Sequence, residues 1–137
     1  MLIQSEQKKV TKAEDIYHVL LAIEKATPEE DKHKERFYAI GLNSQNVILY
    51  VDLVALGTVN YCVPAVRECL RLGITKNAAG LIVAHNHPSG NTEPSSADRE
   101  YTSKIKEACK LVGISLLDHV IYTENNGYYS FADMLAL

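Results

Sequence analysis

The hydrophobic residues of the chain recur first at helical spacing and then in alternating or continuous runs. Residues 11–26 (TKAEDIYHVLLAIEKA) predict a helix whose apolar stripe is formed by Ile16, Val19, Leu20 and Ile23. Thr11 lies three residues before Glu14, which is the spacing of a capping box at the helix start. Residues 27–35 (TPEEDKHKE) are charged and predict a loop, because such a segment has little apolar surface to bury.

Apolar runs of a different kind follow and predict strands. Two β-rich runs, at 36–42 (RFYAIGL) and 47–56 (VILYVDLVAL), flank the polar turn NSQN and predict a hairpin. The run at 78–85 (AAGLIVAH) is continuously apolar, as in a strand buried on both faces. Near the C-terminus, 114–123 (ISLLDHVIYT), the turn ENNG and 128–135 (YYSFADML) predict a closing hairpin and a short final helical piece.

Two more helices are predicted between these strands. Residues 64–73 (PAVRECLRLG) begin with a proline and end with a glycine, and residues 95–113 have helical apolar spacing that stops at a glycine. The order α-β-β-α-β-α-β-β predicts an α/β (α+β) fold, with a mixed β-sheet flanked by helices. We expect residues 1–137 to form a single domain, with 1–34 as an N-terminal helix and charged loop and 35–137 as the core.

Charge and composition narrow the class of protein. The net charge is −3 and the pI is about 5.9, whereas a dedicated nucleic-acid binder usually carries a basic patch, so we expect DNA to bind at most weakly. No apolar run approaches the roughly 20 residues of a membrane helix. The N-terminus MLIQSEQKKV lacks the apolar core of a signal peptide. We therefore expect a cytoplasmic protein with no membrane association.

The cysteines point to a reducing compartment. Cys62, Cys69 and Cys109 are odd in number and form no CxxC pair, which argues against a disulfide framework. We interpret each of them as a free thiol that packs as a small apolar residue.

One stretch, AHNHPSGNTEPSSAD at 84–98, concentrates the residues that can carry chemistry. His85 and His87 are two residues apart at the end of a predicted strand, so both imidazoles point to the same face. A loop from this strand end to the next helix start would bring Asp98 back toward them. Two histidines and one carboxylate with an open fourth position are the ligand set of a catalytic zinc site. Taken singly, Ser95 could be only an N-cap and Asp98 only the acidic member of a capping box.

Two other metal enzymes do not fit this stretch. In HNH nucleases the three letters name residues spread over a ββα-metal motif, whereas here they are neighbours in sequence. Zinc nucleobase deaminases use an H-x-E and P-C-x-x-C pair, which this sequence lacks.

The segment HNHPSGNTEPSSAD resembles the H-x-H and P-S-x-x-D signature of the JAMM (MPN-plus) metalloproteases. In its HNHPSG form, and together with LLDH at 116–119, it resembles the RadC family from about residue 35 to the C-terminus. The resemblance implies a JAMM/MPN-like (cytidine-deaminase-like) sandwich. RadC proteins usually carry an additional N-terminal helix-hairpin-helix region, so we expect this chain to correspond to the JAMM-type domain alone.

The resemblance also implies roles for individual residues. One zinc ion per chain would be bound by His85, His87 and Asp98, and Ser95 would donate a hydrogen bond at the reaction centre. A glutamate would serve as general base, and we favour Glu35 because it directly precedes a strand. Glu29 and Glu30 remain the alternatives.

The implied function is zinc-dependent hydrolysis of an amide or peptide bond in a peptide or protein substrate, with isopeptide bonds as one option. A non-catalytic RadC-like accessory module in DNA repair is the first alternative, and a metal-dependent nuclease is the second. Basic residues do not cluster at the motif, where Arg99 and Lys104 are accompanied by Glu93 and Glu100. This mixture of charges weakens both nucleic-acid readings. The sequence leaves a homodimer open.

The remaining polar candidates receive structural interpretations. Asp118 and His119 are neighbours in a predicted strand, so their side chains point to opposite faces. His119 would either support a metal ligand from behind or lie on the outer face of the sheet, and we favour a structural role. We assign no function to His18 or His33, and we interpret the pair Tyr128-Tyr129 as hairpin packing.

Overall fold

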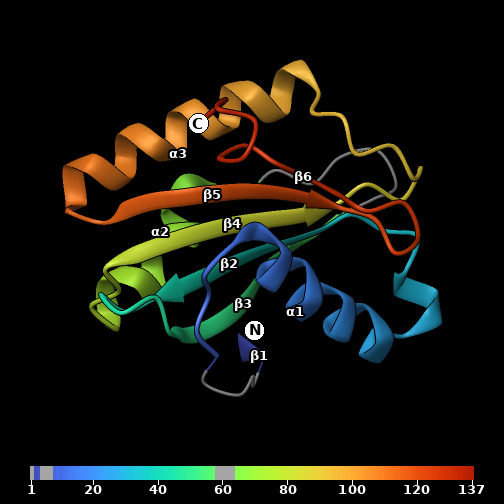
Figure 1. The fold of residues 1–137 in the computed structure, drawn as a ribbon, viewed down its shortest axis with the longest axis horizontal. Helices are drawn as coiled ribbons and strands as arrows, with labels where there is room; N and C mark the ends of the chain where they lie inside the picture. The colour runs from blue at the N-terminus through green and yellow to red at the C-terminus, as the bar shows by residue number, and fades with distance from the viewer. Residues whose placement is uncertain (1, 4–7, 58–63) are drawn as a thin grey trace.

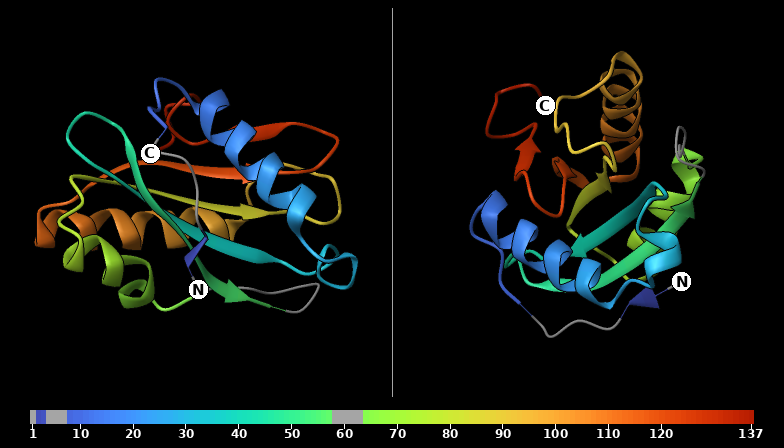
Figure 2. Two further views of the ribbon diagram at one scale, coloured as in Figure 1. Left: turned by 90° about the horizontal axis from the view of Figure 1, so that it is seen from below. Right: turned by 90° about the vertical axis from the view of Figure 1, so that its right-hand side faces the viewer.

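The computed structural model describes residues 2–3, 8–57 and 64–137, and its strands form one mixed sheet covered by helices on both faces. In the described residues the sheet has six strands in the order β1-β3-β2-β4-β5-β6. Helix α1 covers one face, and α2 and α3 cover the other (Figure 1, Figure 2). The predicted α/β fold with a mixed sheet flanked by helices is thus confirmed.

The described strands are β1 (Leu2–Ile3), β2 (Arg36–Leu42), β3 (Ile48–Leu56), β4 (Gly80–Asn86), β5 (Ser115–Tyr122) and β6 (Tyr128–Ser130). The described helices are α1 (Ala13–Ala26), the 3-10 helix η1 (Glu29–Asp31), α2 (Val66–Thr75) and α3 (Ser96–Val112). Each lies where the apolar pattern predicted a regular element, except for β1 and η1, which are too short for a periodic pattern to reveal. The predicted bounds of α2 are wrong, because the helix begins after Pro64 and continues past Gly73 to Thr75. The predicted final helical piece is wrong, because the chain after β6 forms turns.

The pairing of the strands brings distant segments together. β2 pairs antiparallel with both β3 and β4, and Phe37 of β2 lies opposite His85 of β4. β4 and β5 are parallel, so the chain must cross over between them, and α3 makes this crossover. β6 returns antiparallel to β5 as the predicted closing hairpin.

Two apolar cores lie on the two faces of the sheet. Ile82 and Ala84 of β4 pack in the core beneath α1, whereas Leu81 and Val83 pack in the core beneath α2 and α3. Alternate side chains of one strand therefore enter different cores, which explains why the β4 sequence is continuously apolar.

The start of α1 differs in detail from the expected capping box. The carboxylate that caps the helix belongs to Asp15, because its Oδ2 accepts hydrogen bonds from the Thr11 amide and the Thr11 hydroxyl, both at 2.8 Å. Glu14 instead pairs with Lys12 at 3.5 Å on the surface. The hydrogen bonds from Thr11 lower the pKa of Asp15, which favours its charged form at the positive end of the helix.

Two of the three cysteines can be placed. Cys69 and Cys109 are buried free thiols in the core beneath α2 and α3, as predicted. Cys62 lies outside the described residues. Among the helices that the structure describes, none is long and apolar enough to cross a membrane.

Candidate metal centre

The two histidines of the motif converge at the end of β4. His85 is the penultimate residue of β4 and is buried, and His87 follows the strand with its amide bonded to the Tyr122 carbonyl at 3.0 Å. Their Nε2 atoms lie 3.1 Å apart. The predicted common direction of residues i and i+2 therefore holds, even though the second residue lies just beyond the strand.

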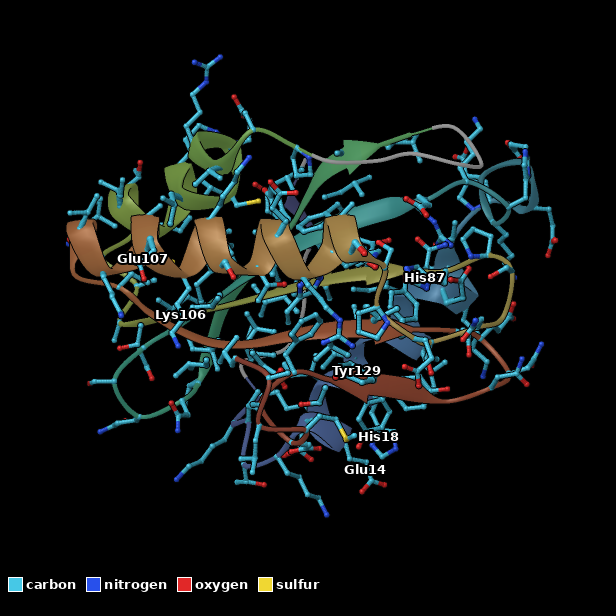
Figure 3. The ribbon with its side chains drawn as sticks, turned by 90° about the horizontal axis from the view of Figure 1, so that it is seen from above. Glu14, His18, His87, Lys106, Glu107 and Tyr129 are labelled. Carbon is cyan, nitrogen blue, oxygen red and sulfur yellow. The ribbon has the colours of Figure 1, made fainter. Side chains whose placement is uncertain are left out.

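Asp98 reaches the same point from the first turn of α3. Its Oδ1 lies 3.3 Å from His85 Nε2, and its Oδ2 lies 3.3 Å from His87 Nε2. In Figure 3, His87 lies beside the N-terminal end of α3. The loop between β4 and α3 thus returns the carboxylate to the histidines, as the sequence predicted.

The spacing of these three side chains fits a metal ion. They are a group of described residues whose potential ligand atoms all lie within 4.8 Å of one another. Ligand atoms about 2.0–2.1 Å from a tetrahedral zinc ion lie roughly 3.3–3.4 Å apart. The two Nε2 atoms here are 3.1 Å apart, and each lies 3.3 Å from a different carboxylate oxygen of Asp98. Two imidazole nitrogens and one carboxylate oxygen suit zinc, and they leave a fourth position of a tetrahedron open.

A hydrogen bond of the His87 side chain orients its Nε2 toward the position that a metal ion would occupy. Its Nδ1 lies 2.7 Å from the carbonyl oxygen of Asn91. A carbonyl only accepts, so Nδ1 carries the proton, and a neutral His87 directs the lone pair of Nε2 toward Asp98. The loop after β4 therefore orients a ligand as well as connecting two elements.

Charge in the cluster favours an ionised carboxylate. Burial opposes ionisation of Asp98, but the neighbouring imidazoles of His85 and His87 outweigh burial and hold the pKa of Asp98 well below its usual range. Burial likewise opposes the charged form of His87, yet the hydrogen bond with Asp98 raises the pKa of that imidazole. In the absence of a metal, a proton is thus the competing partner of the carboxylate.

Glu35 lies near the cluster, immediately before β2. Burial raises the pKa of its half-buried carboxyl, Asp98 adds to this increase, and the charges of His85 and His87 oppose it. The charges of all three candidate ligands therefore act on the Glu35 carboxyl. The assignment of Glu35 as the general base stays a prediction.

Asn86, between the two candidate histidine ligands, holds the backbone around Glu35. Its Oδ1 accepts a hydrogen bond from the Arg36 amide at 2.6 Å, and its Nδ2 donates to the Lys34 carbonyl at 3.0 Å. The Glu35 carbonyl accepts from the Gly57 amide at 2.9 Å. Both peptide groups that flank Glu35 are thereby attached to the strand that carries the histidines.

The other predicted site residues fall into two groups. Ser95 caps α3: its Oγ accepts from the Asp98 amide at 3.0 Å, and its own amide donates to Asp98 Oδ2 at 2.9 Å. The capping box and the ligand cluster thus share Asp98, so the two readings of this residue are compatible. Glu29 and Glu30 are exposed on η1, where Glu29 pairs with Lys32 at 3.3 Å.

His119 has a closer connection to the site than the sequence indicated. It is fully buried, and its Nε2 lies 2.9 Å from His85 Nδ1. Burial lowers the pKa of His119 well below its usual value, and the neighbouring His85 lowers it further. Sequence reasoning noted the LLDH segment but missed this contact and that of Asn86, because both depend on which strands are neighbours in the sheet.

The residues that received no function lie apart from the cluster or pack structurally. His18 pairs with Glu14 at 3.7 Å on the surface of α1, away from His87 in Figure 3. His33 is exposed. The ring of Tyr128 packs on that of Tyr17 of α1 at a centroid distance of 4.9 Å, so this tyrosine has a structural role but packs against a helix and not within the hairpin.

A cleft opens beside the cluster. Its lining includes His87, Asn86, Lys32, Thr123 and Asn126. Its walls are predominantly polar side chains that can form hydrogen bonds.

Comparison with known proteins places the chain in a family. A family model described as RadC-like JAB domain matches residues 10–136. A UPF0758 protein of Chlorobium phaeovibrioides is 37% identical over 130 residues, which cover 95% of this chain and 56% of that protein. A UPF0758 protein of Flavobacterium johnsoniae is 36% identical over 126 residues (92% of this chain, 52% of the relative), and one of Streptococcus sanguinis is 43% identical over 103 residues (75% and 45%).

This chain spans about half the length of the curated relatives that it matches. The family model nevertheless covers almost all of it, including every residue of the candidate metal centre. The resemblance drawn from HNHPSG and LLDH is therefore confirmed, and the chain belongs to the RadC-like JAB domain family.

Proposed function

We propose that this chain is a zinc-dependent metallohydrolase of JAMM type that cleaves an amide or peptide bond, with isopeptide bonds as one option. The observation that carries the proposal is the convergence of His85, His87 and Asp98 on one point beside a half-buried carboxyl, that of Glu35. A site with three protein ligands differs from a structural zinc site, in which four protein ligands close the coordination sphere.

A zinc ion held by these three residues would acidify water and polarise the substrate carbonyl. In the proposed reaction, water adds to the carbonyl carbon, the C–N bond breaks, and a carboxylate and an amine are released. Glu35 accepts the proton that the attacking water loses and then delivers it to the leaving amine. A raised pKa suits this pair of transfers, because the carboxyl must be able both to take and to return a proton.

Ser95 is proposed to stabilise the oxyanion that forms during attack. Its Oγ accepts from the Asp98 amide, so its hydroxyl hydrogen remains available to donate. The same capping box orients Asp98. Replacing Ser95 would therefore affect both the position of a ligand and a hydrogen bond to the reacting carbonyl.

The proposal is tested with a variant that removes the proposed base but keeps the three candidate zinc ligands. Glu35→Gln keeps the size and hydrogen-bonding capacity of the side chain but cannot accept a proton. We expect the zinc-reconstituted variant to retain one zinc per chain by elemental analysis while turnover falls about 10²–10⁴-fold. Turnover is measured by mass spectrometry as new N-termini in a proteome-derived peptide mixture and as freed lysine ε-amines in added lysine-linked isopeptides.

Glu30→Gln is the matched control, because it makes the same chemical change at an exposed carboxylate of η1. It should leave turnover unchanged. A Glu35→Gln variant as active as the parent would contradict the assignment of the base and direct attention to Glu29 and Glu30. A zinc-loaded parent that cleaves no component of either substrate set would contradict the hydrolase proposal and favour the non-catalytic accessory module.

A further inference from the structure

A chain of hydrogen bonds runs from one candidate ligand to the backbone of another. His85 Nδ1 lies 2.9 Å from His119 Nε2, and His119 Nδ1 lies 2.6 Å from Thr102 Oγ1. Thr102 Oγ1 lies 2.7 Å from the carbonyl oxygen of Asp98. The chain thus connects β4 with α3 through a side chain of β5.

The acceptor at its far end sets the direction of every bond in this chain. The Asp98 carbonyl can only accept, so the Thr102 hydroxyl donates to it and has no second proton to give. Thr102 Oγ1 must then accept from His119 Nδ1–H. A neutral imidazole has one N–H, so His119 Nε2 accepts, and His85 Nδ1 donates. The remaining nitrogen of His85 is Nε2, the atom that faces Asp98 and His87.

We infer that His119 is a positioning residue of the metal centre: it selects the tautomer of His85 whose Nε2 can bind zinc, and with Thr102 it holds the β4 ligand in place against α3. The inference rests on the proposed zinc site and adds to it a residue outside the ligand set. Ligating histidines usually donate their second N–H to a carboxylate, a carbonyl or water. Here the acceptor is another imidazole, whose own orientation depends on a threonine.

The surroundings of His119 keep it from finding other partners. Its side chain is fully buried, and its ring stacks on that of Phe131 with centroids 4.9 Å apart and planes 7° apart. Without the Thr102 hydroxyl, His119 could adopt the other tautomer, in which Nε2–H faces His85. The proton of His85 would then shift to Nε2 and block the atom that binds the metal.

The inference is tested with substitutions that keep or remove the hydrogen bonds. His119→Gln retains an acceptor and a donor, whereas His119→Phe retains only a buried ring. Zinc affinity is measured by competition with a chromophoric chelator. We expect His119→Phe to weaken zinc binding about 10–100-fold and His119→Gln to recover most of that loss. Thr102→Val, which keeps the shape but removes the hydroxyl, should weaken binding in the same direction.

Phe131→Leu is the matched control, because it disturbs the packing around His119 without removing a hydrogen bond of the chain. It should lower the thermal stability of the metal-free protein but leave zinc affinity within about threefold of the parent. If His119→Phe binds zinc as tightly as the parent, or if Phe131→Leu weakens binding as much as His119→Phe does, the inference is overturned and His119 acts only through packing.

A measurement on the metal-free protein tests the inferred role of His119 independently of the proposed zinc site. Imidazole ¹H–¹⁵N spectra of the metal-free protein distinguish Nδ1–H from Nε2–H tautomers. We expect His119 to carry its proton on Nδ1, and an Nε2–H signal for this residue would overturn the inference. A parent that takes up no zinc after reconstitution would instead remove the proposed function, whatever the tautomer of His119.

Discussion

Asp118 and His119 show how neighbouring residues of one strand serve opposite faces of the sheet. His119 faces Thr102 of α3 and the metal centre, whereas Asp118 accepts hydrogen bonds from the Ser130 hydroxyl at 2.6 Å and the Ala132 amide at 3.0 Å. The alternation of a strand predicted this division. The partners on each face could not be predicted, because they come from segments that the sheet brings together.

The buried carboxyl of Asp118 leads to a prediction for pH dependence. Burial raises the pKa of Asp118, and its hydrogen bonds only partly oppose this. Because folding raises the pKa of Asp118, its carboxyl stabilises the folded state fully at a pH below the unfolded-state pKa of about 3.9. This stabilisation is lost as the pH rises through the folded-state pKa. The free energy of unfolding of the parent should therefore fall relative to that of Asp118→Asn as the pH rises from about 4, and the difference should then level off.

Urea denaturation of both metal-free proteins between pH 4 and 8 measures this difference. Each unit by which folding raises the pKa corresponds to about 1.4 kcal/mol. A difference between parent and variant that does not change with pH would show that Asp118 is ionised to the same extent in both states.

Residues near one another in sequence were the predictable part of the site. His85 and His87 are linked by strand periodicity, and Asp98 is linked to them by one short loop. Glu35 was selected from three glutamates only because it adjoins a strand, and the Asn86 bonds that hold its backbone depend on the antiparallel pairing of β2 with β4. His119 reaches His85 through the parallel pairing of β4 with β5. Such pairings are set by the whole sheet and have no local signature.

Between elements, α1 is attached to β2 by a buried ion pair that the apolar pattern did not reveal. The Arg36 guanidinium donates to both carboxylate oxygens of Glu24, at 2.9 and 3.1 Å, and also contacts Thr27 Oγ1 at 3.1 Å. The side chains of the pair are only 2% and 5% exposed. Because Arg36 directly follows Glu35, this pair anchors the segment that carries the proposed base.

We predict that Glu24→Gln lowers the free energy of unfolding by about 3–5 kcal/mol, because it leaves a buried guanidinium without a compensating charge. Chemical denaturation of the metal-free protein measures the loss. Glu30→Gln, the same change at an exposed site, should alter stability by less than about 0.5 kcal/mol. The double variant Glu24→Leu/Arg36→Met should recover part of the loss, since it removes both charges. Equal effects of Glu24→Gln and Glu30→Gln would contradict this account of the ion pair.

At the scale of the whole molecule, the candidate metal centre links the end of β4 to the first turn of α3, two elements that also share an apolar core. β4 lies between β2 and β5 inside the sheet, and Asp98 lies in the first turn of α3, which covers one face. The segment 88–94 between them contains no regular secondary structure. A metal ion bound by residues on both sides of this segment would close it as a loop and bind the folded chain in preference to the unfolded one.

We therefore predict that zinc raises the melting temperature of the reconstituted parent. At a free zinc concentration 100 times the Kd, the stabilisation is about 2.7 kcal/mol, which corresponds to roughly 10 °C for a chain of this size. Magnesium, which prefers oxygen ligands, should give little shift. Circular dichroism melts with added zinc, with magnesium and with a chelator measure the effect.

His87→Ala should abolish the zinc shift, whereas His18→Ala, which removes an exposed histidine of α1, should preserve it. An equal shift in His87→Ala and the parent would locate the stabilising zinc elsewhere, because the affinity would then not depend on a residue of this centre.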